Sequence, residues 1–515
     1  MPFQYVARAG SAEEAPHATK PHAPARASRY PHSVVAVSAQ RQGDPLMGAL
    51  GAADPAQRQY LKRVLLSSSI GATVEWYDFF LYGTAAALVF DQLFFPESHP
   101  VFGTLAALAS FGIAYVSRPL GGLVFGHFGD KLGRKNMLVM TLLIMGVGTF
   151  CIGLLPPYSA IGIWAPVLLF ALRFTQGIGL GGEWGGAVLV AVENAPDRRR
   201  GLFGSMVQIG APAGLLLGTG VFTLVAQLPE AQFLAWGWRI PFLLSVILIG
   251  VGYFIRARLL ETPAFTAAKQ SQEEVRAPLL EALRRFPKAA LLTMGARLSE
   301  GQNFNIFAVV IIVYGSEQLG LSTTLLLNGV LIGAFLECLT LPLFGALSDR
   351  IGRRPVFIFG AAFCGLYIFP FFALLDTGST SAILLAPILG FAVGHSAMWA
   401  AEAAFFSEVF STEVRYSGTS FVYQFAGIPS SGIVPVAAAA LIAAADGGFW
   451  LVALFVVGYS VVSVVSVVLA PETNNISLTD VGSAATHAKQ HDRTRQGQPL
   501  ATDSAGVSTS LSGRD

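Results

Sequence analysis

The chain has 515 residues, of which 53% are hydrophobic and 12% charged. Soluble domains carry about 25% charged residues, so this composition excludes an ordinary soluble protein and indicates a membrane protein. The net charge of +2 is not concentrated in one basic patch, and we therefore expect no nucleic-acid partner.

Residues 1–60 precede the first apolar segment and are rich in Ala, Pro, His and Arg. This composition favours a disordered segment. It contains no apolar core of about 7–15 residues followed by a cleavage site, so we expect no secretory signal peptide. Met47 lies shortly before the first apolar segment and is an alternative start to Met1.

Twelve later segments are apolar and long enough to cross a bilayer as a helix, which takes about 20 residues. They cover 64–90, 102–127, 136–156, 163–192, 202–227, 238–257, 289–315, 324–346, 355–375, 382–407, 416–444 and 449–470. We therefore predict an all-α polytopic membrane protein with twelve transmembrane helices.

The positive charges support this count independently. Lys and Arg residues accumulate in the even-numbered connections, for example at Lys131 and in 198–200, whereas the odd-numbered connections lack them apart from Arg239. Cytoplasmic connections carry such an excess of positive charge. The pattern predicts that both termini are cytoplasmic, and the polar composition of the tail, 471–515, favours disorder there.

Two motifs recur along the chain. The pattern Gly-x-x-x-Asp-x-x-Gly-Arg occurs at 126–134 and again at 345–353, 219 residues later, and a Glu followed seven residues later by Arg also occurs twice. These repeats indicate a duplication into two pseudo-symmetric six-helix halves, 61–258 and 289–470, joined by a cytoplasmic loop, 259–288. We predict that the charged motif residues form ion pairs that close the cytoplasmic side. The predicted gating residues are Asp130, Arg134, Glu193, Arg200, Asp349, Arg353, Glu408 and Arg415.

The duplicated loop resembles that of the major facilitator superfamily. Further motifs suggest its metabolite:proton symporter branch, and they are Glu75-Trp-Tyr-Asp78, Ser117-Arg118-Pro-Leu-Gly-Gly, Gly181-Gly-Glu183-Trp-Gly-Gly, Gly237-Trp-Arg-Ile-Pro-Phe and Arg415-Tyr-Ser-Gly418. The resemblance implies a monomeric, proton-coupled carrier in the bacterial inner membrane. That branch includes carriers of shikimate, 2-oxoglutarate, citrate, aromatic acids and zwitterionic osmolytes.

Charged residues inside the predicted spans are candidate site residues, because each costs about 2.5–3.5 kcal/mol at the bilayer centre. Glu75 and Asp78 lie three residues apart, and hence on one face of the first span, and Arg297 and Glu300 have the same spacing in the seventh. The resemblance implies that both spans line a central cavity. We assign Glu75, Asp78 and Glu300 to proton coupling, and a purely structural ion pair remains the alternative.

Two further arginines lie inside spans, Arg118 in the second and Arg173 in the fourth. A guanidinium stays charged and its planar fork matches a carboxylate, so each suits an anionic substrate or a titrating carboxyl. We assign Arg118 and Arg297 to the substrate, with a structural role for Arg118 left open. Arg173 begins a motif that resembles the superfamily's span-four arginine motif, and we assign it to proton coupling.

Other polar side chains complete the predicted cavity. Those assigned to the substrate are Tyr77, Gln208, Gln302, Asn303, Tyr423 and Gln424. We interpret His395 in the tenth span as packed rather than as a proton relay. We expect Glu183 to pair with a neighbouring helix.

These features predict a secondary active transporter that imports a small organic acid together with protons by alternating access. Proton-coupled uptake of a zwitterionic osmolyte, a non-transporting nutrient sensor and drug efflux remain alternatives. The spans carry no nucleophile or metal constellation, and the three cysteines lack metal-ligand spacing, so we expect no enzyme activity, no metal and no cofactor. The expected partners are a carboxylate, protons and membrane lipid.

Overall fold

The computed structural model describes residues 55–95, 100–257, 277–474, 476 and 478. Within these residues the chain is almost entirely helical and forms no strand. The segment up to residue 54, with its predicted disorder and the alternative start at Met47, lies outside the described part.

The first half contains six long helical segments. Short turns connect them, namely α6 (Tyr158–Ile161), η2 (Asp197–Arg199), α10 (Glu230–Gln232) and η3 (Phe233–Gly237). The long segments are α2 (Pro55–Ala85) with η1 (Ala86–Phe90) and α3 (Asp91–Phe94), α4 (Pro100–Leu132), α5 (Arg134–Leu154), α7 (Trp164–Asn194), α8 (Arg200–Gln208) with α9 (Gly210–Val225), and α11 (Arg239–Ala257).

The second half repeats this layout after a short helix, α13 (Pro278–Arg285), that lies within the predicted loop. Its segments are α14 (Pro287–Asn305) with η4 (Ile306–Val310), α15 (Ile311–Val313) and η5 (Tyr314–Gln318), α16 (Thr323–Ile351), α17 (Arg353–Asp376), α18 (Thr380–Leu389) with η6 (Gly390–His395) and α19 (Ser396–Glu408), α20 (Arg415–Gly427) with η7 (Ile428–Gly432) and α21 (Val434–Ala444), and α22 (Trp450–Leu469). These segments correspond to the predicted spans, except that the first begins at Pro55, inside the segment expected to be disordered.

Seven described helices are long and apolar enough to cross a membrane by themselves. The number rises to eight if Glu230–Gly237 and Arg239–Phe254, which are bent by 40° relative to each other, count as one span. Four of the remaining segments, α2, α4, α7 and α14, carry the charged and polar residues that were singled out as site candidates.

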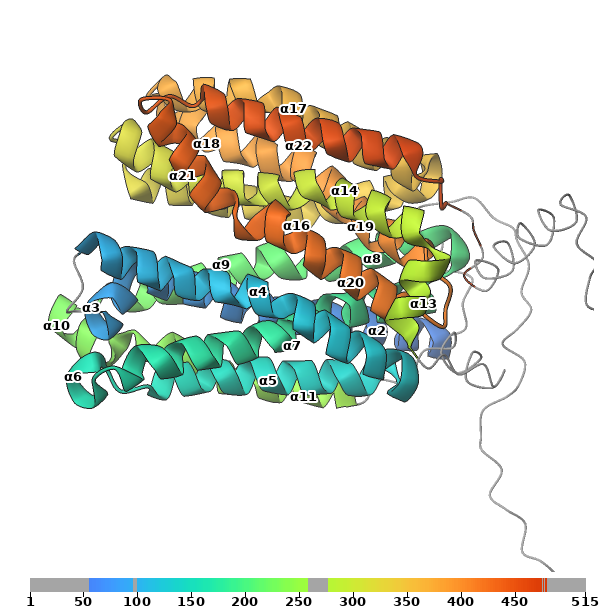
Figure 1. The fold of residues 1–515 in the computed structure, drawn as a ribbon, viewed down its shortest axis with the longest axis horizontal. Helices are drawn as coiled ribbons and strands as arrows, with labels where there is room; N and C mark the ends of the chain where they lie inside the picture. Colours follow the sequence, from blue (N-terminus) through green and yellow to red (C-terminus); the bar gives the residue numbers. More distant parts are fainter. Residues whose placement is uncertain (1–54, 96–99, 258–276, 475, 477, 479–515) are drawn as a thin grey trace, which may run out of the picture. The chain divides into compact units, whose positions relative to one another are not determined.

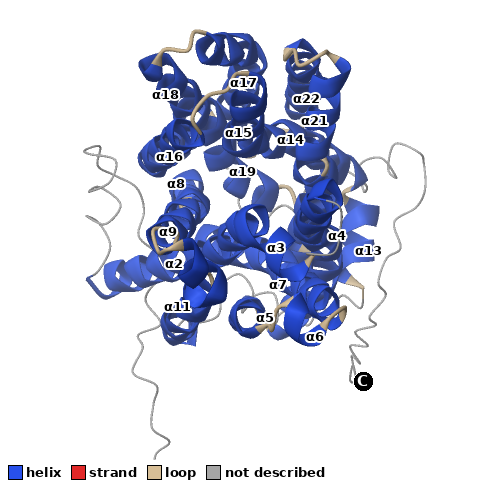
Figure 2. Cartoon of the chain, turned by 90° about the vertical axis from the view of Figure 1, so that its left-hand side faces the viewer, coloured by secondary structure: helices blue, strands red, loops and turns tan. Residues whose placement is uncertain are grey.

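The helices of each half pack mainly on one another, and several pairs join the halves, the two most extensive being α4 with α20 and α8 with α16. Within the halves α4 packs on α7, α2 on α9, and both α14 and α17 on α22. Figure 1 shows the blue-to-green helices as one group and the yellow-to-red helices as another, and Figure 2 shows the two groups from their ends. Contacts of α4 with α20 and of α16 with α8 connect the halves. Because α4 corresponds to α16 and α8 to α20, these two contacts are related by the duplication.

The glycines of the duplicated loop adopt a conformation that other residues avoid. Gly133 has φ 107° and ψ 152°, and Gly352, the equivalent glycine in the second half, has φ 108° and ψ 159°. This region of backbone space is populated essentially by glycine alone. Each of these residues lies at the break between two long helices, so the glycine lets the chain reverse direction there within one residue.

We predict that Gly352→Ala destabilises the protein. The left-handed backbone costs about 1–3 kcal/mol for a residue with a Cβ, and the new Cβ would also lie 2.6 Å from Oε2 of Glu472. The measurement is the Tm of the purified protein in detergent, which we expect to fall. Gly458→Ala in α22 is the matched control because a Cβ there meets no atom within 4 Å. An equal Tm for both variants would contradict the prediction.

Candidate functional site

Two adjoining cavities lie between the halves and share Trp76, Arg118 and Tyr423 in their walls. The empty space in and around the first is about 390 Å³ and around the second about 340 Å³, open space at their mouths included. Helices α2, α4 and α7 contribute side chains from the first half, and α14, η6, α19 and α20 contribute them from the second. The cavities are therefore lined by both halves, as the predicted central site requires.

Arg118 lies in the shared wall with its charge largely unpaired. Its guanidinium carbon is 4.1 Å from the ring centre of Tyr115 and 4.6 Å from that of Phe79. The side chain is buried, and Nε and Nη2 have no hydrogen-bond partner among the described residues. Tyr115 also forms a side-chain hydrogen bond with the guanidinium, but the aromatic faces themselves supply no acceptor for the two remaining N–H groups. A buried guanidinium of this kind is suited to receive an anion.

Arg297 approaches the same cavity from the second half, but carboxylates already balance its charge. It forms an ion pair with Glu300 and lies 3.3 Å from Oε1 of Glu402. Its guanidinium carbon is 3.7 Å from the ring centre of Tyr423. That ring in turn stacks on Trp184 at 3.7 Å, and its buried hydroxyl has no partner in the described chain. Arg118 and Arg297 therefore differ in how much charge each offers to a ligand.

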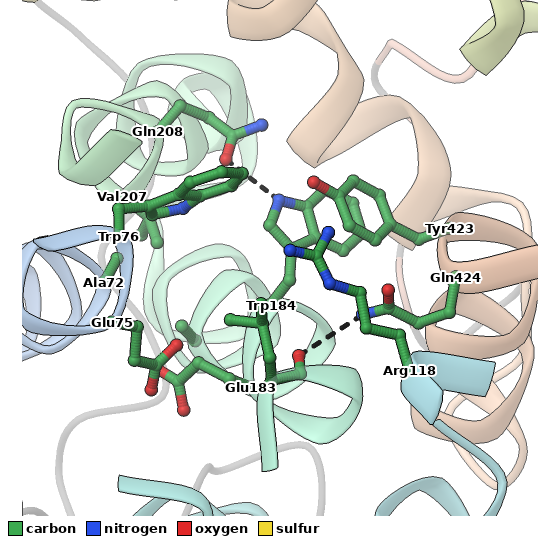
Figure 3. A pocket seen from close by; sticks show the side chains of 12 residues that line it. Ala72, Glu75, Trp76, Arg118, Glu183, Trp184, Val207, Gln208, Tyr423 and Gln424 are labelled. Carbon is green, nitrogen blue, oxygen red and sulfur yellow. Dashed lines mark hydrogen bonds between the residues drawn. The ribbon is translucent and has the colours of Figure 1, made fainter. Parts of the chain in front are cut away.

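The two predicted glutamines reach across the boundary between the halves. Gln208 accepts a hydrogen bond from Nε1 of Trp184 at 3.0 Å and donates to the carbonyl of Trp399 at 3.1 Å. Gln424 donates to the carbonyl of Gly181 at 3.0 Å. Figure 3 shows both amides at the rim of the first cavity, with Arg118 beside the rings of Trp184 and Tyr423. The two amides join the halves as well as lining the cavity.

Two carboxyl groups, Glu75 and Glu183, lie on the far side of the first cavity and point toward each other in Figure 3. Oε2 of Glu183 accepts a hydrogen bond of 2.9 Å from Thr141 on α5. Glu183 thus bonds to a neighbouring helix, as expected, and also borders the cavity. The first cavity therefore has a cationic side and an acidic side.

Asp78 and Arg173 form a separate buried group behind the cavities. Asp78 is 1% exposed, and neither carboxylate oxygen has a hydrogen-bond partner among the described residues. Arg173 interacts electrostatically with Asp78 and lies 4.0 Å from the ring centre of Tyr82. It also donates to Gln176 at 3.3 Å. The two residues that were assigned separately to proton coupling therefore lie near each other.

Three residues assigned to the substrate lie outside the walls of both cavities. Tyr77 donates to the carbonyl of Pro241 at 2.8 Å, and Asn303 donates to the carbonyl of Ser299 at 2.7 Å. Gln302 is fully buried and borders neither cavity. For Tyr77 and Asn303 the neighbouring main chain provides the partner that their polar groups need inside a membrane.

Sequence reasoning missed the aromatic lining, which includes Tyr115, Trp184 and Trp399. A signal was available for two of these residues. Trp184 and Trp399 are 215 residues apart, the same offset that separates Glu193 from Glu408. Aligning the two halves residue by residue would have paired these tryptophans.

His395 is not merely packed, and this corrects the sequence interpretation. Its Nδ1 lies 2.5 Å from Oε1 of Glu337 and its Nε2 lies 3.1 Å from Oε1 of Glu300. All three side chains are buried, and His395 and Glu300 border the second cavity. The sequence did not indicate this arrangement because the three residues come from three separate spans.

The two loop aspartates bind helix ends in the opposite half. Asp130 accepts hydrogen bonds from the backbone N–H groups of Tyr416 at 3.2 Å and Ser417 at 2.9 Å. Asp349 accepts from those of Gly201 and Leu202, both at 2.8 Å. These N–H groups belong to the first turns of α20 and α8, where a carboxylate is favoured by the helix dipole. We call this end of the bundle the motif end.

The other motif charges add ion pairs at the motif end. Arg353 binds both oxygens of Glu408, at 3.2 and 3.1 Å, and Arg415 bonds to Glu193 at 3.1 Å. Arg200 lies 3.9 Å from Glu408. The Arg415 and Arg200 pairs each connect the two halves. The motif charges therefore form ion pairs and helix-end contacts, as predicted, although the side chain of Arg134 lies outside the described part.

Part of the tail that was expected to be disordered is bound at the motif end. Glu472 accepts hydrogen bonds from the backbone N–H groups of Arg353 at 2.9 Å and Arg354 at 3.1 Å. The carbonyl of Ile476 accepts from Arg200 at 2.5 Å, and that of Leu478 accepts from Arg415 at 2.8 Å. The buried Arg200 and Arg415 bind carbonyl groups of the tail, and the composition of the tail gave no sign of these contacts.

A family model of sugar (and other) transporters matches residues 64–289 and 280–484. The shikimate transporter of Escherichia coli (strain K12) is 42% identical over 416 residues, which cover 80% of this chain and 95% of that protein. The chain belongs to the sugar (and other) transporter family. The proline/betaine transporter of the same organism, another relative, is 33% identical over 444 residues, which cover 84% of this chain and 87% of that protein.

Solved structures of a major facilitator superfamily member share the fold. The proton:xylose symporter XylE bound to 6-bromo-6-deoxy-D-glucose matches 83% of this chain and 99% of its own, with a TM-score of 0.64 and 19% identity. The inward open conformation of XylE matches with a lower TM-score, 0.56. The predicted twelve-helix fold in two halves is thereby confirmed, and the protein is a multi-pass membrane transporter.

We predict that Asp349→Asn opens the motif end of this transporter more often. The change removes a charge-assisted partner of two backbone N–H groups, a contact worth about 1.5 kcal/mol or more, so the open population should rise roughly tenfold. The readout is maleimide labelling of Ser205→Cys, a fully buried position between α8 and α16, with the three native cysteines replaced. Asp376→Asn is the control, because Asp376 is the last residue of α17 and lies away from the motif end. Equal labelling rates would count against a gating role for Asp349.

Proposed function

We propose that this transporter imports a small carboxylate together with protons by alternating access. The observation that carries the proposal is Arg118, a buried guanidinium in the wall between the halves whose Nε and Nη2 have no partner in the described chain. An intramembrane cation of this kind is costly unless something compensates it. A carboxylate would supply both the charge and a planar pair of acceptors.

The remaining cavity walls favour a small ring-shaped acid. Trp76, Tyr115, Trp399 and Tyr423 provide flat apolar faces, and Gln208 and Gln424 provide polar groups at the rim. Such a lining matches ligand sites in which aromatic residues supply contact and a few polar groups fix orientation. The likeness to a shikimate transporter supports this choice, because shikimate is a hydroxylated cyclic carboxylate.

Proton coupling is assigned to Asp78. Burial in low-dielectric surroundings favours the neutral form of any carboxyl, whereas a nearby cation such as Arg173 favours the ionised form. A movement that changes the distance between the two groups would therefore bind and release a proton. This supports the assignment of Asp78 and Arg173 to one proton-coupling pair, and Glu75 lies one helical turn away on the same face of α2.

The motif end is proposed to be cytoplasmic, with both termini on that side and the protein in a bacterial inner membrane, where it works as a monomer. The positive connections that the structure describes, for example those at Lys131, Arg200 and Arg353, lie at this end, in agreement with the charge bias of cytoplasmic loops. The cross-half ion pairs would then hold the cytoplasmic side closed while the substrate enters from outside.

A zwitterionic substrate is the second candidate. One observation favours it, because the first cavity places the carboxyl groups of Glu75 and Glu183 opposite Arg118. A molecule with both charges would satisfy both sides, and the likeness to a proline/betaine transporter agrees with this choice. Shikimate and proline betaine in one uptake assay separate the two candidates.

We predict that Arg118→Gln abolishes shikimate uptake. Loss of one partner of a buried charge pair costs about 2–5 kcal/mol of binding, and Arg118→Lys should recover only part of it because it lacks the planar fork. The measurement is radiolabelled shikimate uptake into proteoliposomes under an imposed proton gradient, with protonophore added in parallel. Arg239→Gln, which removes a cation bound to the Gly153 and Leu155 carbonyls, is the control. Uptake by Arg118→Gln at the wild-type level would refute the proposal.

We predict that Asp78→Asn separates exchange from accumulation. Asparagine cannot carry the proton, so uphill uptake should fail while counterflow of shikimate between preloaded vesicles and medium continues. Glu230→Gln, an exposed carboxyl at the start of α10, should leave both activities unchanged. Full accumulation by Asp78→Asn would move the coupling site elsewhere.

A further inference from the structure

A carboxyl, an imidazole and a second carboxyl form a continuous chain inside the second half. Nδ1 of His395 lies 2.5 Å from Glu337, and Nε2 lies 3.1 Å from Glu300. The residues come from η6, α16 and α14, and all three are at most 3% exposed. We refer to Glu300, His395 and Glu337 as the triad.

If both contacts of His395 are hydrogen bonds, the triad needs an extra proton. Two nitrogen-to-oxygen hydrogen bonds need two hydrogens, but a neutral imidazole has only one N–H and a carboxylate has none. The second hydrogen would lie either on the ring, which is then an imidazolium, or on one carboxyl. Loss of that proton would place a nitrogen lone pair against a carboxylate oxygen and break one of the two contacts.

The surroundings of the triad make its charge depend on protons. Oε2 of Glu337 and Oε2 of Glu402 are buried without a hydrogen-bond partner in the described chain. Two cations lie near the triad in the described chain: Arg297, which pairs with Glu300, and Arg118, which borders the second cavity together with Glu300 and His395. The other titratable groups are Cys338 from α16, Cys364 from α17 and Glu402 from α19, and Tyr115 and Tyr423 border the same cavity. Three carboxyls thus lie near two guanidiniums, and a proton reduces an excess of negative charge that low-dielectric surroundings disfavour.

The triad connects directly to the proposed substrate cavity. Glu300 pairs with Arg297, whose guanidinium lies 3.7 Å from the ring centre of Tyr423, and that ring is part of the wall that also contains Arg118. His395 and Glu300 border the second cavity themselves. Protonation of the triad lowers the negative charge beside the cavity, so an anion binds there at lower electrostatic cost. Proton and anion binding are therefore linked.

We propose that the triad is a second proton-binding site, so that the transporter carries two protons with each acid, one at Asp78 and one at Glu337–His395–Glu300. The inference rests on the proposed function. It has a consequence that a single site lacks. One monocarboxylate anion with one proton moves no net charge, whereas one anion with two protons moves one positive charge inward.

The experiment measures charge and shikimate flux together in proteoliposomes that contain the full chain. The wild type should give an inward positive current on addition of shikimate, and its reversal potential should correspond to two protons per acid. In Glu337→Gln the amide can donate to one ring nitrogen while the ring donates to Glu300, so both contacts persist without the extra proton. This variant should still take up shikimate down a pH gradient, but without current.

His395→Gln removes the ring and is a second variant with the same expected result. It keeps the test possible if Glu337→Gln does not fold. Glu317→Gln, an exposed carboxyl in η5, is the control and should keep the wild-type current. A full current with wild-type stoichiometry in both triad variants would overturn the second site, and so would a wild type that is electroneutral. If the wild type shows no shikimate flux, the proposed function is contradicted instead. The wild-type flux is measured before any variant is compared, so the two failures are distinguishable.

Discussion

The cost of a charge inside a membrane governs how this transporter is built. Each buried ionisable group needs a partner, because the bilayer interior supplies neither water nor counterions. At the motif end this need is met by protein groups from the opposite half, as with Arg415 and Glu193. In the centre it is met incompletely, and Arg118 keeps unpaired donors toward a cavity. The complete pairs hold the two halves together, and the incomplete one leaves a place for a ligand.

The two ends of the same helices therefore have different tasks. In α4, Asp130 binds the first turn of α20 while Arg118, twelve residues earlier, borders the cavity. In α8, the first turn binds Asp349 while Gln208 at its end reaches Trp399. A rigid helix transmits a displacement at one end to the other. Ligand contact in the centre and ion-pair rearrangement at the motif end are thus mechanically connected through single helices.

Sequence reasoning predicted the features that repeat or that are expensive. The twelve spans followed from apolar length and charge bias, and the gating residues followed from a motif present twice. The repeated motif also contains Gly133 and Gly352, whose positive φ angles in the structure explain why glycine stands at both positions. Intramembrane charge also pointed to Arg118, Arg297 and Asp78. These signals are local in the sequence.

The features that were missed depend on contacts between distant spans. His395 was read as packed because neither Glu300 nor Glu337 is near it in sequence, and Tyr77 was read as a ligand although the carbonyl of Pro241 takes its hydroxyl. The rotation of a helix about its axis decides whether a buried polar group contacts a neighbouring helix or the cavity. A hydropathy pattern does not fix that rotation for helices that are apolar on all sides.

The bound tail has a practical consequence for handling this protein. Ile476 and Leu478 are held through their backbone carbonyls, so the contacts with Arg200 and Arg415 do not require particular side chains there. Reporter domains or affinity tags fused after residue 478 should therefore leave the motif end intact, whatever linker follows. A shorter expression version that stops at the last helix, near Leu469, would instead leave two buried arginines short of an acceptor and should be avoided in crystallisation or cryo-microscopy work.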